Sequence, residues 1–175
     1  RSPHDGYTLL FINGGILSVT PLVVPNAGYD GGKDFAPVAL VSKAPMFLVV
    51  NQSVPAKDLQ GFVSYVREQK EPVSYASAGV GSFGHLSSEL FAQQAGAKMN
   101  HIPYKGQSGT TNAIVSGEVK MLLTTPSATM NEFISNGRLH LLGVGSRQAS
   151  SLAPGIPPIG SVLPGYESEA WFAIL

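Results

Sequence analysis

Apolar residues between positions 57 and 144 alternate between the spacing of one helix face and the short runs of buried strands. The stretch "KDLQGFVSYVREQ" has helical spacing, which predicts a helix over about 57–69. Two further helices are predicted over about 84–95 and 107–116, the second ended by Gly117 in a left-handed cap. The apolar face of the first helix consists of Leu59, Phe62, Val63 and Val66.

Short apolar runs between these helices predict strands. A further helix is expected after the strand "EVKMLL", with Thr125 as its N-cap, Pro126 as its first residue and Gly137 as its stop. Strands that alternate with helices of this length favour βαβ units and a largely parallel sheet. The strand sequences are "PVSYAS", "MNHIPY", "EVKMLL" and "RLHLLGV".

The two ends of the chain differ from this middle part. We expect residues 35–145 to form one α/β lobe, residues 1–34 to be part of another lobe, and residues 146–175 to cross over and return a strand to it. "DGYTLLF" and "AWFAIL" predict strands, whereas 146–167 is rich in proline and glycine and predicts an extended segment. The expected fold class is α/β, with one parallel lobe and part of a second.

The amino-acid composition excludes several classes of partner and of functional site. The 175 residues are 43% hydrophobic and 13% charged, which is typical of a globular protein with a sizeable core. Eleven basic residues balance eleven acidic ones, so no positive field gathers nucleic acid and no such partner is expected. The absence of cysteine excludes disulfides, thiol nucleophiles and thiolate metal sites. The four histidines lack the spacing of a metalloprotease or a triad, so we expect neither a catalytic nor a metal site.

The stretch "YASAGVGSFGHL" carries Gly79, Gly81 and Gly84 in the G-x-G-x-x-G spacing of dinucleotide-binding folds. Those folds need an acidic residue about 20 positions later, and "NHIPYKG" in that region contains none. A nucleophile elbow requires glycine where Val80 stands, and a P-loop requires Lys-Ser or Lys-Thr after the glycines. These three kinds of site are disfavoured, and no cofactor is expected.

What remains is a strand end, exposed N–H groups and a helix N-terminus, which together favour an anion. Ser77 and Ser82 can add hydroxyl donors, and His85 either contacts the ligand or bonds to the loop. The structural alternative is that Ser82 only caps the helix and the glycines only permit a tight turn. Thr124 and Thr125 end another strand at a helix start, on the side of a parallel sheet where ligands bind. The sequence therefore predicts a receptor for a small anion.

Several stretches in order along nearly the whole chain resemble the Bug family, the TctC-type extracytoplasmic solute receptors of tripartite tricarboxylate transporters. The resemblance implies a periplasmic-binding-protein clamshell (type II-like) of two α/β lobes that closes on a small carboxylate. It also implies a periplasmic location, no enzymatic activity, and partnership with the membrane components of such a transporter. The matching stretches include "DGYTLLF", "YDGGKDFAPVALV", "VVNQSVPAKDL", "VSYASAGVGSFGHLSSELF", "NHIPYKG", "PSATMNEFISNGRL" and "LPGYESEAWFAIL".

The resemblance also implies the ligand contacts. Many relatives carry Asp-Asn before "PS", where this chain has Leu123 and Thr124, so the ligand is expected to be a di- or tricarboxylate without an amine. In the second lobe the implied contacts are Ser77, Gly79, Gly81, Ser82, His85, Thr124 and Thr125, and in the first lobe they are Asn13, Gly14 and Gly15.

Two further expectations follow from the resemblance. The family's first strand and its glycine-bearing anion loop precede "DGYTLLF", so the chain is interpreted as part of a receptor. Apolar surface that faces the other lobe would then favour self-association. Two other classes stay open: an α/β enzyme acting on a phosphate or carboxylate ester through the glycine loop, and a sensory effector domain. A thermal-shift screen of carboxylates against phosphate esters separates the receptor from the enzyme.

Overall fold

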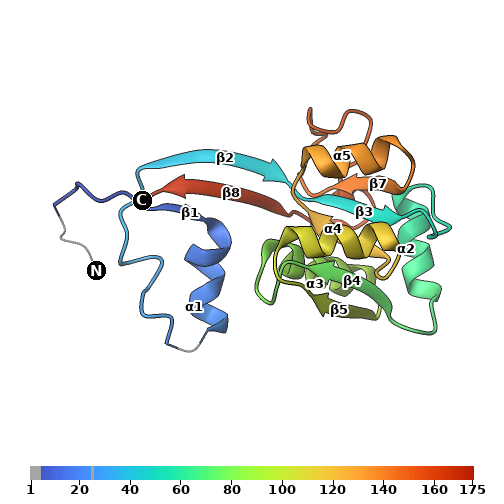
Figure 1. The fold of residues 1–175 in the computed structure, drawn as a ribbon, viewed down its shortest axis with the longest axis horizontal. Helices are drawn as coiled ribbons and strands as arrows, with labels where there is room; N and C mark the ends of the chain where they lie inside the picture. Colours follow the sequence, from blue (N-terminus) through green and yellow to red (C-terminus); the bar gives the residue numbers. More distant parts are fainter. Residues whose placement is uncertain (1–4, 25) are drawn as a thin grey trace. The chain divides into compact units, whose positions relative to one another are not determined.

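The structure, a computed structural model, describes residues 5–24 and 26–175. These residues form two compact units (Figure 1). Unit 1 contains the described residues up to Ala44 together with Ala170–Leu175, and unit 2 is Pro45–Glu169. Within the described residues, no helix combines the length and the apolar character needed to cross a bilayer.

Unit 2 is built on a five-stranded sheet with the order β5-β4-β6-β3-β7. β4 pairs in parallel with β5 and with β6, while β6 and β7 both pair antiparallel with β3 and so run in the same direction as each other. The sequence of β4, β5, β6 and β7 therefore forms the predicted βαβ units, each with a helix between strands. The bounds are β3 Phe47–Asn51, β4 Val73–Ser77, β5 Met99–Pro103, β6 Met121–Thr124 and β7 Leu139–Val144.

β3 corrects the expectation of one parallel lobe, because it runs opposite to both of its neighbours. It follows β2 (Ala39–Pro45) after the single residue Met46, so its direction is not set by a helical crossover of the kind that makes strands parallel. All five residues of β3 are buried, which is expected of a strand that is covered on both faces.

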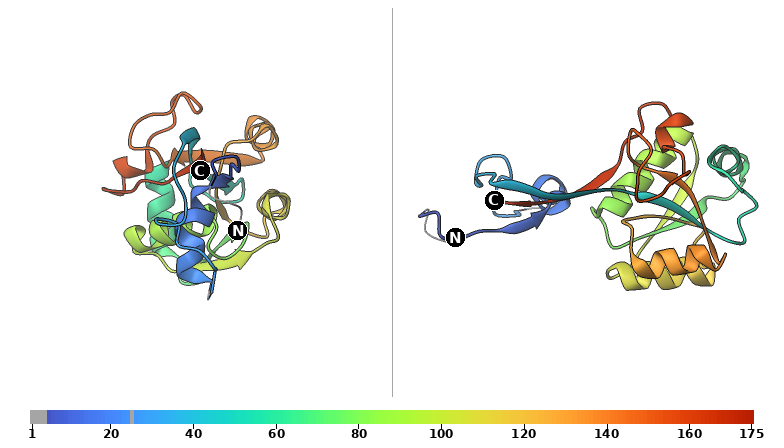
Figure 2. Two further views of the ribbon diagram at one scale, coloured as in Figure 1. Left: turned by 90° about the vertical axis from the view of Figure 1, so that its left-hand side faces the viewer. Right: turned by 90° about the horizontal axis from the view of Figure 1, so that it is seen from above.

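Four helices cover the sheet of unit 2: α2 (Leu59–Glu68), α3 (Phe83–Ala95), α4 (Gln107–Ser116) and α5 (Ala128–Ser135). α4 and α5 lie on one face, and α2 and α3 on the other (Figure 2). Ile114 and Met130 pack on the first face against Phe47 of β3. On the other face Phe62 and Phe91 are fully buried, with ring centroids 5.8 Å apart. The helices predicted from periodicity are confirmed.

The caps explain where these helices begin and end. Asp58 and Ser82 accept hydrogen bonds from N–H groups of the first turns of α2 and α3, and Gly117 ends α4 with φ 83°. The predicted start of α5 is wrong, because Ser127 and not Thr125 is its N-cap. The Ser127 hydroxyl accepts from the Met130 N–H at 3.2 Å, and the helix begins two residues after Pro126.

Unit 1 contains a three-stranded sheet with the order β1-β8-β2, in which β1 (Phe11–Asn13) pairs antiparallel with β8 (Glu169–Ile174). The strand predicted over "AWFAIL" is present as β8, whereas the one predicted over "DGYTLLF" is displaced, because β1 begins only at Phe11. A π-helical segment (Gly15–Val19) and the short α1 (Thr20–Val23) follow β1. These turns are too short to produce an apolar period in the sequence.

The compact units differ from the predicted domain boundaries at two places. β2 pairs in the sheet of unit 1, so residues 35–44 do not belong to unit 2. Residues 146–169 belong to unit 2 because they bond to it: Ser168 donates its N–H to the Gly145 carbonyl at 2.8 Å, and the Tyr166 hydroxyl donates to the Ser87 carbonyl at 3.0 Å.

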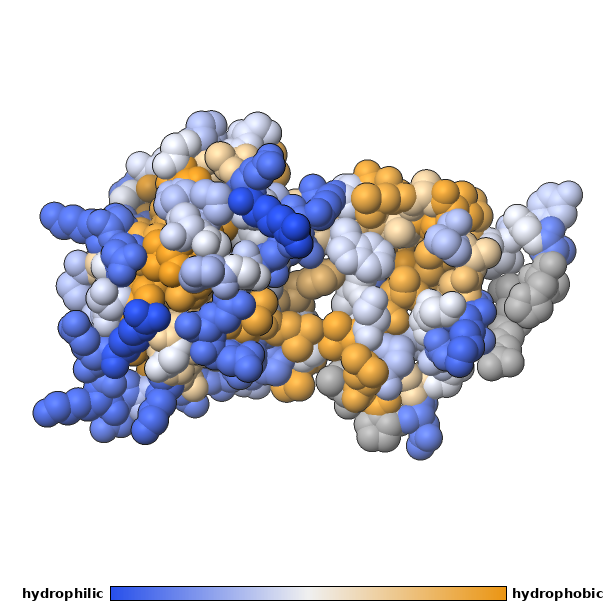
Figure 3. Space-filling model, turned by 180° about the vertical axis from the view of Figure 1, so that it is seen from behind, coloured by the Kyte–Doolittle hydropathy of each residue, from blue (hydrophilic) through white to orange (hydrophobic). Residues whose placement is uncertain are grey.

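Unit 1 carries most of the exposed large hydrophobic side chains, seen as orange atoms in Figure 3. Leu22 is 84% exposed and Leu40 64% exposed, and both lie outside the small core of unit 1 around Ile12. Self-association through such surface remains a prediction.

Candidate functional site

Three helices of unit 2 begin directly after parallel strands, at the edge of the sheet that the carboxyl ends of these strands form. β4 ends at Ser77, β5 at Pro103 and β6 at Thr124, and each strand leads into α3, α4 or α5. The first-turn N–H groups of a helix lack intrahelical acceptors and carry a partial positive charge. This edge is therefore suited to a small anion.

The glycine loop between β4 and α3 folds around Gly79. The Ser77 hydroxyl donates to the Gly79 carbonyl at 3.0 Å and accepts from the Gly79 N–H at 3.2 Å. The Ser82 hydroxyl donates to the same carbonyl at 2.7 Å. Gly79 and Gly81 have φ values of 131° and 79°, which side chains other than glycine rarely tolerate. Both predicted serines therefore hold the loop in shape.

Ser82 has a second role as the N-cap of α3, because its Oγ accepts from the His85 N–H at 3.3 Å. The N-cap expected from the sequence is thus present, and it does not exclude a ligand. In the part of the chain that the structure describes, no group accepts a hydrogen bond from the N–H of Phe83 or of Gly84. These two amides at the start of α3 are available to an anion.

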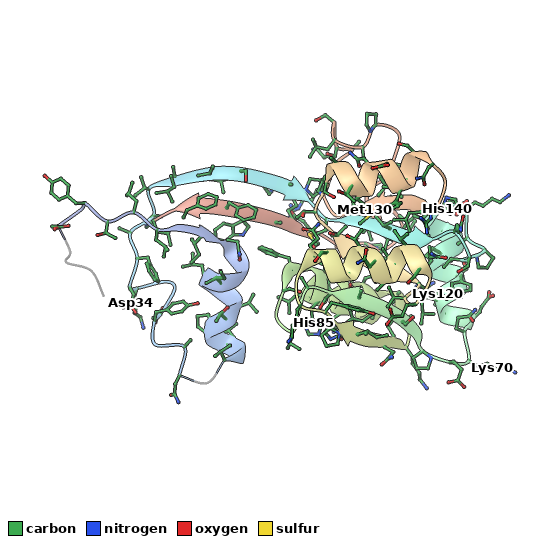
Figure 4. All side chains as sticks on the ribbon, in the orientation of Figure 1. Asp34, Lys70, His85, Lys120, Met130 and His140 are labelled. Carbon is green, nitrogen blue, oxygen red and sulfur yellow. The ribbon has the colours of Figure 1, made fainter. Side chains whose placement is uncertain are left out.

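The side chain of His85 folds back on the loop, and Nδ1 accepts from the Gly81 N–H at 3.2 Å. Figure 4 shows His85 at the start of α3. Its ring stacks on His101 of β5, with ring centroids 4.1 Å apart and planes 25° apart. The structural hydrogen bond from His85 to the loop is therefore present, and this bond requires an unprotonated Nδ1.

His101 was not among the predicted site residues, yet it contacts two of them. Its Nε2 lies 2.7 Å from the Ser77 Oγ, and its ring also stacks on Tyr75, with centroids 5.0 Å apart. Tyr75 and His101 are partners in the β4–β5 register. No local sequence signal identifies His101, because the register that joins the two strands is not visible in either strand alone.

Burial controls the protonation of this cluster. Desolvation lowers the pKa of His101, the charge of His85 lowers it further, and Glu89 opposes both. The pKa of Tyr75 is raised by burial and by its hydrogen bond to the Glu89 carboxylate. His101 is therefore neutral at neutral pH, as is Tyr75. The structure contains no group of three or more metal-ligating side chains among its described residues.

The end of β6 approaches the glycine loop through backbone packing. A Cβ on Gly84 would lie only 2.7 Å from the Leu123 carbonyl oxygen, so α3 starts directly against β6. Thr124 is buried, and its Oγ1 accepts from the Gln107 Nε2 of α4 at 3.0 Å. The structure thus brings Thr124 and Thr125 to the same edge as the glycine loop.

The predicted contacts of unit 1 follow β1. The Asn13 Oδ1 accepts from the Ile16 N–H at 3.0 Å and so satisfies the first turn of the helical segment. Gly14 and Gly15 are buried, and a Cβ on Gly14 would lie 2.2 Å from the Trp171 ring. Only glycine allows this approach of Trp171, so Gly14 has a packing role whether or not it contacts a ligand.

Comparison with known proteins gives consistent matches. The family model described as "Tripartite tricarboxylate transporter family receptor" matches residues 1–175. The structure of Rpa4515 from R. palustris with adipate superposes with a TM-score of 0.87 at 30% identity, over 99% of this chain and 58% of that chain. MatC from Rhodopseudomonas palustris with bound malate superposes with a TM-score of 0.82 at 26% identity, over 99% of this chain and 59% of that chain.

The periplasmic binding protein BugD gives a TM-score of 0.84 at 26% identity, over 99% of this chain and 58% of BugD. The periplasmic-binding-protein fold expected from the sequence is confirmed by these superpositions. The chain spans about half the length of the curated relatives that it matches.

Proposed function

Because this chain belongs to the family of tripartite tricarboxylate transporter receptors, we propose that it is part of a periplasmic receptor that captures a small di- or tricarboxylate. The observation that carries the proposal is the edge where α3, α4 and α5 begin, with the unpaired N–H groups of Phe83 and Gly84. Such amides bind carboxylates without a basic side chain. The adipate and malate held by Rpa4515 and MatC support this ligand class.

The proposed contacts in unit 2 are the loop and strand-end residues at this edge. The contacts proposed in unit 1 rest on the family resemblance. The receptor binds and releases its ligand without a chemical step, and it delivers the ligand to the membrane components of the transporter. The proposed set is Ser77, Gly79, Gly81, Ser82, His85, Thr124 and Thr125 in unit 2, with Asn13, Gly14 and Gly15 in unit 1.

The ligand is further proposed to lack an amine. Leu123, where many relatives carry Asp, is 1% exposed, and its side chain offers an ammonium group no acceptor. A buried ammonium without a partner is unfavourable.

Isothermal titration tests both statements with matched pairs: succinate against aspartate and glutarate against glutamate, together with adipate and malate. We expect each diacid to bind at least tenfold more tightly than its amino acid. Tighter binding of the amino acids would refute the amine-free ligand. Binding of phenyl phosphate but of no carboxylate would refute the receptor function and favour the ester-acting enzyme.

A further inference from the structure

His101 contacts two separate parts of the candidate site. Through Nε2 it reaches the Ser77 hydroxyl at 2.7 Å, and through its ring it stacks on His85 at 4.1 Å. Ser77 in turn holds Gly79, and His85 holds Gly81. Both glycine N–H groups of the loop are thus fixed by side chains that His101 contacts.

We propose that His101 is a positioning residue for carboxylate binding, which holds the glycine loop through Ser77 on one side and through His85 on the other. The inference rests on the function proposed above. His101 need not touch the ligand. It keeps the loop in the conformation that directs the Phe83 and Gly84 amides outward, so that the receptor does not have to order them on binding.

The hydrogen bonds of Ser77 form a complete set with His101 as a donor. The hydroxyl has one proton, which it donates to the Gly79 carbonyl at 3.0 Å. Its oxygen then accepts from the Gly79 N–H at 3.2 Å and from the His101 Nε2–H at 2.7 Å. Ser77 is 1% exposed, so water does not replace a lost partner.

The ring contacts supply the second connection. Tyr75 lies in contact with the His101 ring and is itself fixed by Glu89, whose carboxylate accepts from the phenol. His85 stacks on His101 in the orientation in which Nδ1 accepts from Gly81. Tyr75 is thus a titratable group in contact with the His101 ring, and it links that ring to the Glu89 carboxylate. Burial and the neighbouring His85 both lower the pKa of His101, which keeps the stacked pair from carrying two charges.

Two substitutions separate these connections. His101→Gln retains an N–H near the position of Nε2 and removes the ring, whereas His101→Phe retains the ring and removes the N–H. We expect each to weaken adipate binding about three- to tenfold, because each removes one of the two supports. His140 on β7, at the opposite edge of the sheet from β5, provides the matched control His140→Gln, which is expected to bind adipate as the wild type does.

A nitrogen NMR spectrum of the imidazoles gives a readout that general destabilisation does not produce. At neutral pH the wild type and His101→Phe should show His85 with an unprotonated Nδ1, whereas His101→Gln should show a mixture of His85 tautomers. In His85→Gln the pKa of His101 should rise, since the electrostatic contribution by which His85 lowers it is removed. This last variant keeps His101, and it tests the coupling even if the His101 variants fail to fold.

The outcomes distinguish the two proposals. A wild-type protein that binds neither adipate nor malate overturns the proposed function, while the NMR spectra still decide the coupling of His101 to His85. If the wild type binds adipate and both His101 variants bind it as tightly as the wild type does, the positioning role is wrong. It is also wrong if the His85 spectrum is the same in all variants and the pKa of His101 is unchanged in His85→Gln.

Discussion

Ser82 offers a direct test of whether an anion lies at the start of α3, because its capping role and its proximity to the ligand can be separated. Its Oγ accepts from the His85 N–H at 3.3 Å and donates to the Gly79 carbonyl at 2.7 Å. Ser82→Ala removes both bonds, and Ser82→Asp retains the acceptor for the His85 N–H. Aspartate is also a favoured N-cap, so α3 keeps its capped start in that variant.

Ser82→Ala should therefore change mainly the stability, and Ser82→Asp mainly the affinity for adipate. Ser82→Ala is expected to lower the free energy of unfolding by about 0.5–2 kcal/mol, the usual value of an N-cap. Its effect on adipate binding should be less than about tenfold, because the hydroxyl proton belongs to the Gly79 carbonyl and a neutral hydrogen bond contributes about 0.5–1.5 kcal/mol. Ser82→Asp should be less destabilised than Ser82→Ala, because it keeps the cap and loses only the bond to the Gly79 carbonyl.

For Ser82→Asp the magnitude in binding follows from Coulomb's law. Two like charges about 5 Å apart repel by about 3 kcal/mol at an effective dielectric constant of about 20, which weakens binding by about a hundredfold. Urea denaturation measures the stability, and isothermal titration with adipate at low salt measures the affinity. The control is Ser135→Asp, which adds the same charge at the exposed far end of α5. Wild-type affinity in Ser82→Asp would refute an anion site at the start of α3.

Two other predictions concern packing and ionisation. Gly84→Ala should lower the free energy of unfolding by about 1–3 kcal/mol and weaken adipate binding, because its Cβ would lie 2.7 Å from a backbone carbonyl. In the control Gly61→Ala in α2, the Cβ would meet only side-chain atoms, with the Asp58 carboxylate at 3.1 Å and the Ala56 Cβ at 3.9 Å, so stability should change by less than about 1 kcal/mol in urea denaturation. Burial and then the hydrogen bond to Glu118 raise the pKa of Tyr104 to about 12, so the folded state holds the phenol proton more tightly than the unfolded chain. That stabilisation is present below pH 10 and is lost as the pH rises from 10 to about 12. In Glu118→Gln, ultraviolet titration should show a lower pKa for Tyr104, and an unchanged value would contradict this cause.

The elements of unit 2 that could be predicted are those set by local patterns. α2 and α3 begin after capping side chains and present apolar residues at helical spacing, so their bounds follow from the sequence within two residues. β3 could not be assigned a direction in this way. Its antiparallel pairing depends on the link through Met46 to β2, and a single buried strand has the same apolar pattern in either direction.

The same distinction explains the start of α5. Thr125 and Ser127 are both acceptable N-caps by residue type, and the choice depends on which of them has extended backbone angles beside the end of β6. Local propensity does not separate them. Asn13 to Gly15 are a comparable case, since the helical turn that follows β1 contains no apolar period and Gly14 is selected by Trp171 from the other end of the chain.

At the candidate site, the sequence identified the loop, whereas the structure changes which groups remain for a ligand. Ser77 and Ser82 were expected to offer hydroxyl donors, but both protons are directed to the Gly79 carbonyl. The N–H groups of Gly79 and Gly81 are likewise used within the site. The donors that remain are the first amides of α3, and their direction depends on the loop conformation. Because that conformation is fixed by side chains on β4, β5 and α3, ligand affinity should respond to residues such as His101 that lie behind the loop as well as to residues on its surface.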